Sequence, residues 1–308
     1  MKRLLLAAIT ALILGGGATR AGPFDDAGAA LLRGDRANAL RILLPIAQAG
    51  NAQAQEDIGE MFWFGHGTMQ DHAEAVKWLR RSAAQGKAQS QILLGEAYDF
   101  GKGVLRDYSE AVKWYRQAAE QGAALGQFKL GWMCANGRGV PQDYVEALKW
   151  YRLAAEGGNA VSTMAQYGLG TMYSAGRGVP RDYAEALKWF RMAAEKGDSD
   201  ALQRVGFIYA NGNGVPQDDV EALKWYRLAA ERGHTLAQLN VGSAYFSGKG
   251  VRPDHVRGYM WVGLAAAAGD AEAAKIRDRL VKALTPMQLA ESKKLARECQ
   301  ERKFKGCD

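Results

Sequence analysis

Histidine and serine are the side chains of this chain best suited to metal binding and nucleophilic catalysis. Their spacing argues against both roles. His66 and His72 lie six residues apart, and His234 and His255 lie far from them and from each other. No two of them have the three- or four-residue spacing that places two ligands on one face of a helix, and no H-E-x-x-H motif occurs. We therefore predict no metal site.

A nucleophilic serine is not predicted either. β-Lactamases and penicillin-binding proteins carry a lysine three residues after the catalytic serine, and no serine of this chain has one. The G-x-G elements lack the further glycine, or the Lys-Ser/Thr, of a phosphate-binding loop. We expect a protein that is not an enzyme and needs no cofactor.

The elements that position these residues come from an internal repeat. A tryptophan column has spacings of 36, 36, 39, 36 and 36 residues: Trp78, Trp114, Trp150, Trp189, Trp225 and Trp261. A glycine column keeps the same step: Gly59, Gly95, Gly131, Gly170, Gly206 and Gly242. The spacing of 39 reflects a three-residue insertion between Gly158 and Gly170, whose role the sequence leaves open. A period of this length indicates stacked supersecondary units.

Each copy has the pattern of two helices, as the second copy illustrates. A first helix is predicted from about Ala88 to Phe100, and Gly101-Lys102-Gly103 ends it because glycine accepts left-handed backbone. Asp107 then begins a second helix as N-cap, and Glu110 predicts a capping box in which each side chain bonds the other residue's amide. The D-x-x-E pattern recurs at Asp71/Glu74, Asp143/Glu146, Asp182/Glu185 and Asp218/Glu221.

The second helix has one apolar stripe, with Ala111, Trp114, Tyr115 and Ala118 at positions i, i+3, i+4 and i+7. This spacing favours a core role for the tryptophan column over a cofactor site. In the first helix, Cys134 stands where other copies have an aromatic residue, so we predict a buried thiol. Cys299 and Cys307 could close a small loop, but pairing depends on a geometry that sequence alone does not supply.

The segment from Leu94 to Gly122, with its L-G, G-x-G-V, aspartate cap and W-Y-x-x-A-A elements, resembles the Sel-one-like repeat family of tetratricopeptide-like proteins. The resemblance covers all six copies. It implies an all-α, right-handed α-solenoid of six 36-residue helix-turn-helix repeats, with N- and C-terminal capping helices, that binds protein. Some relatives are described as β-lactamase-like, but the paired cysteines of that subgroup are absent here.

The domain organisation follows from this repeat. We predict a signal peptide at 1–21, an N-terminal capping helix pair at 22–50, six repeats at 51–269 and C-terminal capping helices at 270–308. Lys2 and Arg3 precede an eleven-residue apolar run, and cleavage is expected after Ala21. That run is too short to span a bilayer, which takes about 20 residues. The mature chain is therefore expected in the periplasm or outside the cell.

The charge gives no indication of a nucleic-acid partner. The formal net charge of +7 falls to +4 once Lys2, Arg3 and Arg20 leave with the signal peptide. Acidic and basic residues are interspersed along the rest, as on a solvated helical surface. We predict no nucleic-acid binding and no transmembrane segment in the mature chain.

A partner-binding column should differ between copies, whereas core columns should not. One residue after the column glycine, Trp132 and Phe207 stand among polar residues, and Lys129 and Arg204 precede them by three positions on the same helix face. Aromatic side chains beside basic ones are good anchors for a partner. We predict that these four residues bind a partner on the concave face; the alternative is that both rings pack into the adjacent repeat.

The function predicted from these features is an exported adaptor or regulator that binds another protein of unknown identity. An alternative is a scaffold for cell-envelope polysaccharide or cell-wall machinery. A β-lactamase-like enzyme is a third possibility, which the missing S-x-x-K motif opposes. The sequence leaves the pathway and the oligomeric state open.

Overall fold

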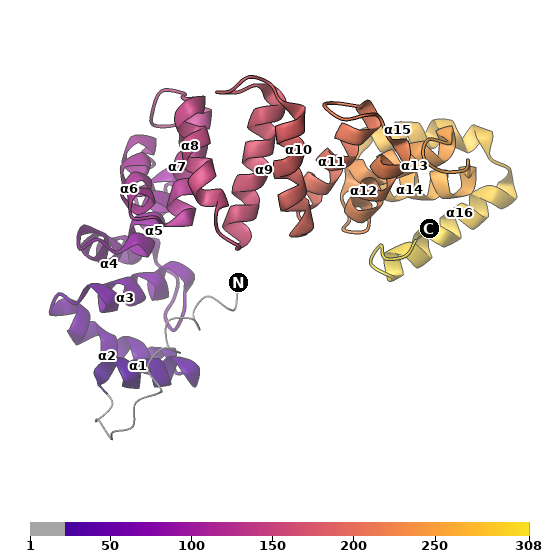
Figure 1. Cartoon of the computed structure of the whole chain (residues 1–308). Helices are drawn as coiled ribbons and strands as arrows, with labels where there is room; N and C mark the ends of the chain where they lie inside the picture. Colours follow the sequence, from indigo (N-terminus) through magenta and orange to yellow (C-terminus); the bar gives the residue numbers. More distant parts are fainter. Residues whose placement is uncertain (1–21, 308) are drawn as a thin grey trace, which may run out of the picture. The chain divides into compact units, whose positions relative to one another are not determined.

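The computed structural model of the chain describes residues 22–307. The predicted signal peptide and its cleavage site after Ala21 lie outside the described residues. The described chain forms sixteen α-helices and one short 3-10 helix, and no strand occurs in it (Figure 1). It divides into two compact units at Asp143–Tyr144, and each unit is described by itself.

The first unit contains the helices α1 (Pro23–Leu32), α2 (Arg36–Gln48), α3 (Ala52–Phe64), α4 (His72–Ala84), α5 (Ala88–Phe100), α6 (Tyr108–Glu120) and α7 (Ala124–Asn136). Each helix packs on the next one along the chain. Helices α3, α5 and α7 are the first helices of successive repeats, and they also contact one another in succession.

The second unit contains α8 (Tyr144–Ala155), α9 (Ala160–Ala175), α10 (Tyr183–Glu195), α11 (Ser199–Asn211), α12 (Asp219–Ala230), α13 (Thr235–Ser247), α14 (His255–Ala267), α15 (Ala271–Leu280), the 3-10 helix η1 (Val281–Ala283) and α16 (Pro286–Glu301). Consecutive helices pack up to α15, and α16 returns to pack on α14. The helix pairs confirm the predicted all-α solenoid architecture. None of the helices in the described part of the chain is long and apolar enough to cross a membrane.

Glycines set how closely the two helices of a repeat approach. A Cβ atom added at Gly95 of α5 would lie 2.5 Å from the Tyr115 ring of α6, and one at Gly206 of α11 would lie 2.7 Å from the Tyr226 ring of α12. Such distances leave no room for a side chain, because protein interiors are close-packed. Tyr115 is fully buried as a result.

The turn after each first helix requires glycine for a second reason. Gly101 ends α5 with φ 69°, the left-handed conformation that the sequence predicts for a helix C-cap. Gly103 has φ 71°, and a Cβ there would lie 2.3 Å from the carbonyl oxygen of His72 at the start of α4. The turn of one repeat therefore sits directly on the preceding repeat.

The aspartate caps of α4, α6, α10 and α12 are confirmed, but the capping boxes predicted for these four helices are wrong. Asp107 Oδ1 accepts hydrogen bonds from the amides of Ser109 and Glu110. The amide of Asp107 donates to the carbonyl of Tyr98 at 3.0 Å, across to α5, so it does not need the Glu110 side chain. The same amide-to-carbonyl bond is made by Asp71, Asp143, Asp182, Asp218 and Asp254.

The glutamates of the D-x-x-E pattern bind forward along the helix instead. Glu74 accepts hydrogen bonds from the Trp78 indole at 3.1 Å and from Lys77 at 2.7 Å. Equivalent indole bonds join Trp150 to Glu146 and Trp225 to Glu221. These contacts orient three members of the tryptophan column, whereas the indole nitrogens of Trp114 and Trp189 are buried without a hydrogen-bond partner among the described residues.

A buried glutamine column, not recognised in the sequence, joins successive repeats. Gln91 donates to the carbonyl of Ala83 at 3.2 Å, and Gln127 donates to that of Ala119 at 3.3 Å. Both carbonyls lie at the end of a second helix, where the last four carbonyls have no partner within the helix. Other members of the column with the same bond are Gln55, Gln166 and Gln238. The column therefore caps helices, and its polarity is structural.

The three cysteines form one buried thiol and one disulfide. Cys134 is a buried thiol, which confirms the prediction. Cys299 and Cys307 form a disulfide with their Cα atoms 5.2 Å apart, which answers the question that the sequence left open. The segment after α16 folds back, and Phe304 and Cys307 pack against the core of the second unit.

Candidate partner-binding surfaces

The α7 surface consists of Lys129 and Trp132, one turn apart on one face of α7. Lys129 Nζ lies 2.9 Å from Glu96 Oε1 of α5, and both side chains are largely covered. Its ammonium also lies 5.5 Å from the centre of the Phe100 ring. Lys129 therefore joins two repeats of its own chain.

Trp132 is half-buried, and a cation covers its ring. The Arg138 guanidinium carbon lies 4.6 Å from the centre of the Trp132 ring and 5.5 Å from the centre of the Tyr108 ring. A cation over an aromatic face is stabilised by the ring quadrupole. The α7 surface thus already has intramolecular partners for both of its predicted anchors.

A buried carboxylate explains why two cations gather there. Asp99 is only 6% exposed, and its closest polar contact is the Tyr115 hydroxyl at 3.5 Å. Burial raises the pKa of Asp99, whereas the positive charges of Lys129 and Arg138 act to lower it. The basic residues near Trp132 therefore help to neutralise carboxylates within the unit.

On α3, the positions equivalent to Lys129 and Trp132 are the acidic residues Asp57 and Glu60. Burial, together with the charges of Glu56 and Asp57, raises the pKa of Glu60 to about 7, against a hydrogen bond from Gln89 that lowers it. Burial also raises the pKa of Asp57. Three carboxylates on one helix, with little solvent around two of them, make this part of α3 sensitive to pH near neutrality.

The α11 surface consists of Arg204 and Phe207, and it is open. Phe207 is 40% exposed, although its neighbours Val205 and Ile208 on α11 are buried in the core. Arg204 is exposed and forms no ion pair with any other described residue. An exposed aromatic ring beside an unpaired guanidinium is the combination predicted to anchor a partner.

The structure brings together Lys129 with Trp132 and Arg204 with Phe207, one pair in each unit. Phe207 is exposed, whereas Trp132 is half-buried and lies under Arg138. The repeat position that Trp132 and Phe207 share did not predict this difference in exposure. It depends on Glu96 and Arg138, which contact Lys129 and Trp132 from outside α7.

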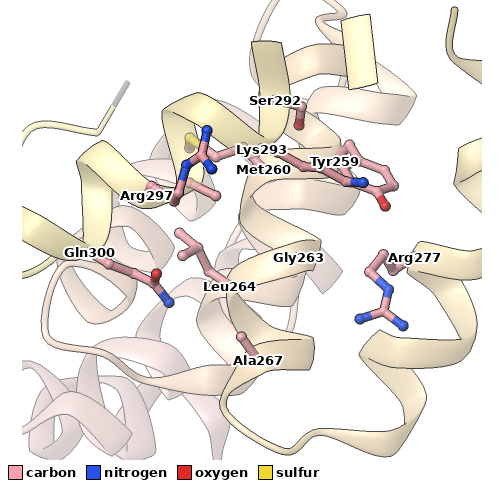
Figure 2. Close-up of a pocket in the computed structure, with 11 residues that line it drawn as sticks. Tyr259, Met260, Gly263, Leu264, Ala267, Arg277, Ser292, Lys293, Arg297 and Gln300 are labelled. Atoms are coloured by element: carbon pink, nitrogen blue, oxygen red, sulfur yellow. The ribbon is translucent and has the colours of Figure 1, made fainter. Parts of the chain in front are cut away.

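Helices α14, α15 and α16 enclose a groove that sequence analysis did not predict (Figure 2). We call it the C-terminal groove; its volume is about 550 Å³. Its basic lining includes Arg277, Lys293 and Arg297. The sequence carried one signal of it, the Lys293–Arg297 pair at i, i+4.

The histidines have structural positions. His234 Nδ1 accepts a hydrogen bond from the amide of Ala237 as the N-cap of α13, and its Nε2 lies 3.0 Å from Asp200 Oδ1. His255 stacks on Phe246, and His72 packs edge-on against Trp63. Within residues 22–307, no three His, Cys, Asp or Glu residues are grouped so that they could hold a metal ion.

Comparisons with known proteins agree with the repeat architecture. The family model for the Sel1 repeat matches residues 52–87, 88–122, 124–159, 163–198, 199–234 and 235–270. A Sel1 repeat protein from Oxalobacter formigenes is 35% identical, with a TM-score of 0.67, over 77% of this chain and 94% of that one. A search of curated proteins gave no match.

A second solved structure is that of c5321, a protective antigen of uropathogenic Escherichia coli strains. It is 28% identical, with a TM-score of 0.60, over 93% of this chain and 70% of that one. Sel1 repeats are generally protein-interaction modules, and proteins built from them are typically non-enzymatic scaffolds. With six matched repeats in succession, this chain belongs to the Sel1 repeat family.

Proposed function

We propose that the mature chain is an exported adaptor or regulator that binds another protein, and that the α11 surface anchors this partner. The observation that carries the proposal is the 40% exposure of Phe207 beside the unpaired Arg204. Aromatic and arginine side chains dominate the energetics of protein interfaces. A partner segment with an apolar side chain and a carboxylate would satisfy both groups.

Two features support a location outside the cytoplasm. The first 21 residues have the pattern of a cleavable secretory signal. The Cys299–Cys307 disulfide is of a kind that persists in oxidising compartments. Export is tested by the N-terminal sequence of the protein recovered from the periplasmic fraction, which should begin at Gly22. A chain that keeps Met1 and remains in the cytoplasm would contradict this part of the proposal.

The binding site is tested with two matched variants in one repeat. Phe207 on α11 and Leu228 on α12 are 40% and 41% exposed, so their alanine variants remove similar amounts of exposed apolar surface. We expect Phe207→Ala, but not Leu228→Ala, to lose a protein retained by the mature wild-type chain from a cell-envelope extract. The measurement is quantitative mass spectrometry of the retained proteins.

Thermal melting of both variants serves as the control, because neither should change the midpoint by more than a few degrees. Equal retention of partners by the two variants would exclude the α11 surface. If glycan, and no protein, is retained by the wild-type chain, the polysaccharide scaffold replaces the adaptor as the better account.

A further inference from the structure

The C-terminal groove has an apolar floor and basic walls. Gly263, Leu264 and Ala267 of α14 lie on its floor, between Arg277 of α15 and Arg297 of α16 (Figure 2). Helices α15 and α16 both pack on α14, but they make at most marginal contact with each other. The groove is therefore an open trough along one face of α14.

The charge of the groove has one sign. Its lining contains three cationic side chains and no carboxylate. Arg277 has a partner, because its guanidinium lies 2.7 Å from the Asp278 carboxylate. Lys293 and Arg297 are exposed and form no ion pair with another described residue.

The face of α16 directed away from the groove differs. There Lys294 and Arg302 both lie within 4 Å of the Glu298 carboxylate, at 3.9 and 3.8 Å. Lys294 and Arg302 thus share a carboxylate, whereas Lys293 and Arg297 on the groove side have none within the described chain.

Gly263 is the second observation that points to a ligand. Glycine is unfavourable inside a helix, and the column glycines have a steric reason to be there. A Cβ at Gly242, for example, would lie 2.6 Å from Val262. A Cβ at Gly263 would meet no atom within 4 Å. Nothing in the described chain requires glycine at this position, whereas the close approach of another backbone would.

We propose that the C-terminal groove binds an acidic, amphipathic helical segment of a partner protein. Lys293 and Arg297 are separated by one turn, about 6 Å along the helix axis. Carboxylates four residues apart on a ligand helix have the same separation. Apolar side chains on the adjoining stripe of that helix would cover Ala267, which is exposed, and its backbone would approach Gly263.

The apolar floor favours a protein segment over a uniformly polar anion such as a polysaccharide. Apolar side chains gain free energy there by leaving water, and a sugar chain has few to offer. The groove is a surface separate from the α11 surface, so this inference does not depend on the function proposed above.

The test is a selection from a phage-displayed library of random 16-residue peptides on the mature, oxidised chain. Binding of the enriched peptides is then measured by fluorescence anisotropy to three variants. Gly263→Leu fills the floor, and Lys293→Gln/Arg297→Gln removes the unpaired charges. Lys294→Gln/Arg302→Gln removes the same charge from the other side of α16 and is the matched control.

We expect the enriched peptides to carry Asp or Glu at i, i+4 and to bind Gly263→Leu and Lys293→Gln/Arg297→Gln at least tenfold more weakly. The control should change binding less than threefold, and all variants should keep the wild-type helical circular dichroism. Phe207→Ala should bind these peptides as the wild-type chain does, which separates this site from the α11 surface.

Three results would overturn the proposal. These are an absence of enriched peptides, enrichment without acidic residues, and equal losses in the groove variant and the control. Displacement of an enriched peptide by phosphatidylglycerol vesicles, but not by vesicles of neutral lipid, would instead identify a membrane surface as the occupant.

Discussion

The α7 and α11 surfaces occupy the same positions of the repeat but have different surroundings. On α7, Lys129 is paired with Glu96 of the preceding repeat and Trp132 lies under Arg138. On α11, Arg204 has no ion-pair partner among the described residues and Phe207 is exposed. The comparison teaches that a variable repeat position can serve either internal packing or recognition, and that the neighbouring repeats decide which.

The positions of the side-chain contacts between repeats provide a physical reason for the difference. In the first unit, Lys129 of α7 reaches Glu96 of α5. In the second unit, α11 contacts the next repeat through Asp200, which lies 3.0 Å from His234 at the start of α13. That contact lies one turn away from Arg204 and leaves it without an ion pair among the described residues.

The largest expected effect is one that the two units share, because both depend on the same glycine column. Gly95→Val and Gly206→Val should each lower the free energy of unfolding by about 3 kcal/mol, since the new side chain would overlap a buried tyrosine ring. Urea denaturation of the mature chain gives the values. Loss in only one of the two variants would contradict the equivalence of the two cores.

Trp132→Ala and Phe207→Ala should then separate the two surfaces. Trp132 loses half-buried ring area and its contact with Arg138, so we expect a stability loss of about 2 kcal/mol. Phe207→Ala should cost about 0.5 kcal/mol, because much of the ring is already in water. Amide hydrogen exchange of α7 and α11 measures each loss locally. Losses of equal size would mean that the surroundings of the two rings do not differ as described.

The repeat itself was predictable from sequence because glycine and tryptophan columns report local constraints. Gly101 needs a left-handed backbone, and Asp107 caps the helix that follows it, whatever lies further away. The role of Glu110 was not predictable in this way. It depends on the Tyr98 carbonyl, which reaches the Asp107 amide only once the two helices have packed.

The candidate sites were predicted less well, for the same reason. Lys129 and Arg204 look alike in sequence, and only the position of Glu96 across a helix interface distinguishes them. The C-terminal groove arises because α15 and α16 both pack on α14 and leave its Gly263 face uncovered. No local pattern around Gly263 specifies where two later helices will lie.

Glu60 of α3 should make the stability of the first unit depend on pH. The folded-state pKa of Glu60, about 7, lies above its ordinary value of 4.5, so the folded chain binds the proton more tightly than the unfolded one. The stability from this group is therefore present below about pH 4.5 and is lost as the pH rises through 7. Glu60→Gln should raise stability at pH 8 by about 1–2 kcal/mol and leave it unchanged at pH 4.5.

Urea denaturation at the two pH values measures this difference. Ser243→Ala, at the same column position of the second unit, is the control, because a neutral residue there should give the same small change at both pH values. A stability gain of Glu60→Gln that is the same at both pH values would indicate that the gain does not arise from the titration of Glu60.

The smallest expected effect tests the charge difference between the two surfaces directly. Lys129→Met removes the partner of Glu96 and a cation near the buried Asp99, so we expect a loss of about 1 kcal/mol at pH 7. Arg204→Met should change stability by less than about 0.5 kcal/mol, because Arg204 has no ion pair to lose within the described chain.

The pH dependence of the two losses distinguishes an ion pair from mere packing. Lys129 favours the ionised form of Asp99, so its contribution is present above the pKa of Asp99 and falls as Asp99 is protonated in acid. The cost of Lys129→Met should therefore shrink between pH 7 and pH 4, and in a Glu96→Gln background it should already be smaller at pH 7. A cost that stays constant with pH would mean that Lys129 acts through its hydrocarbon chain, and the α7 surface would then be as free to meet a charged partner as the α11 surface is.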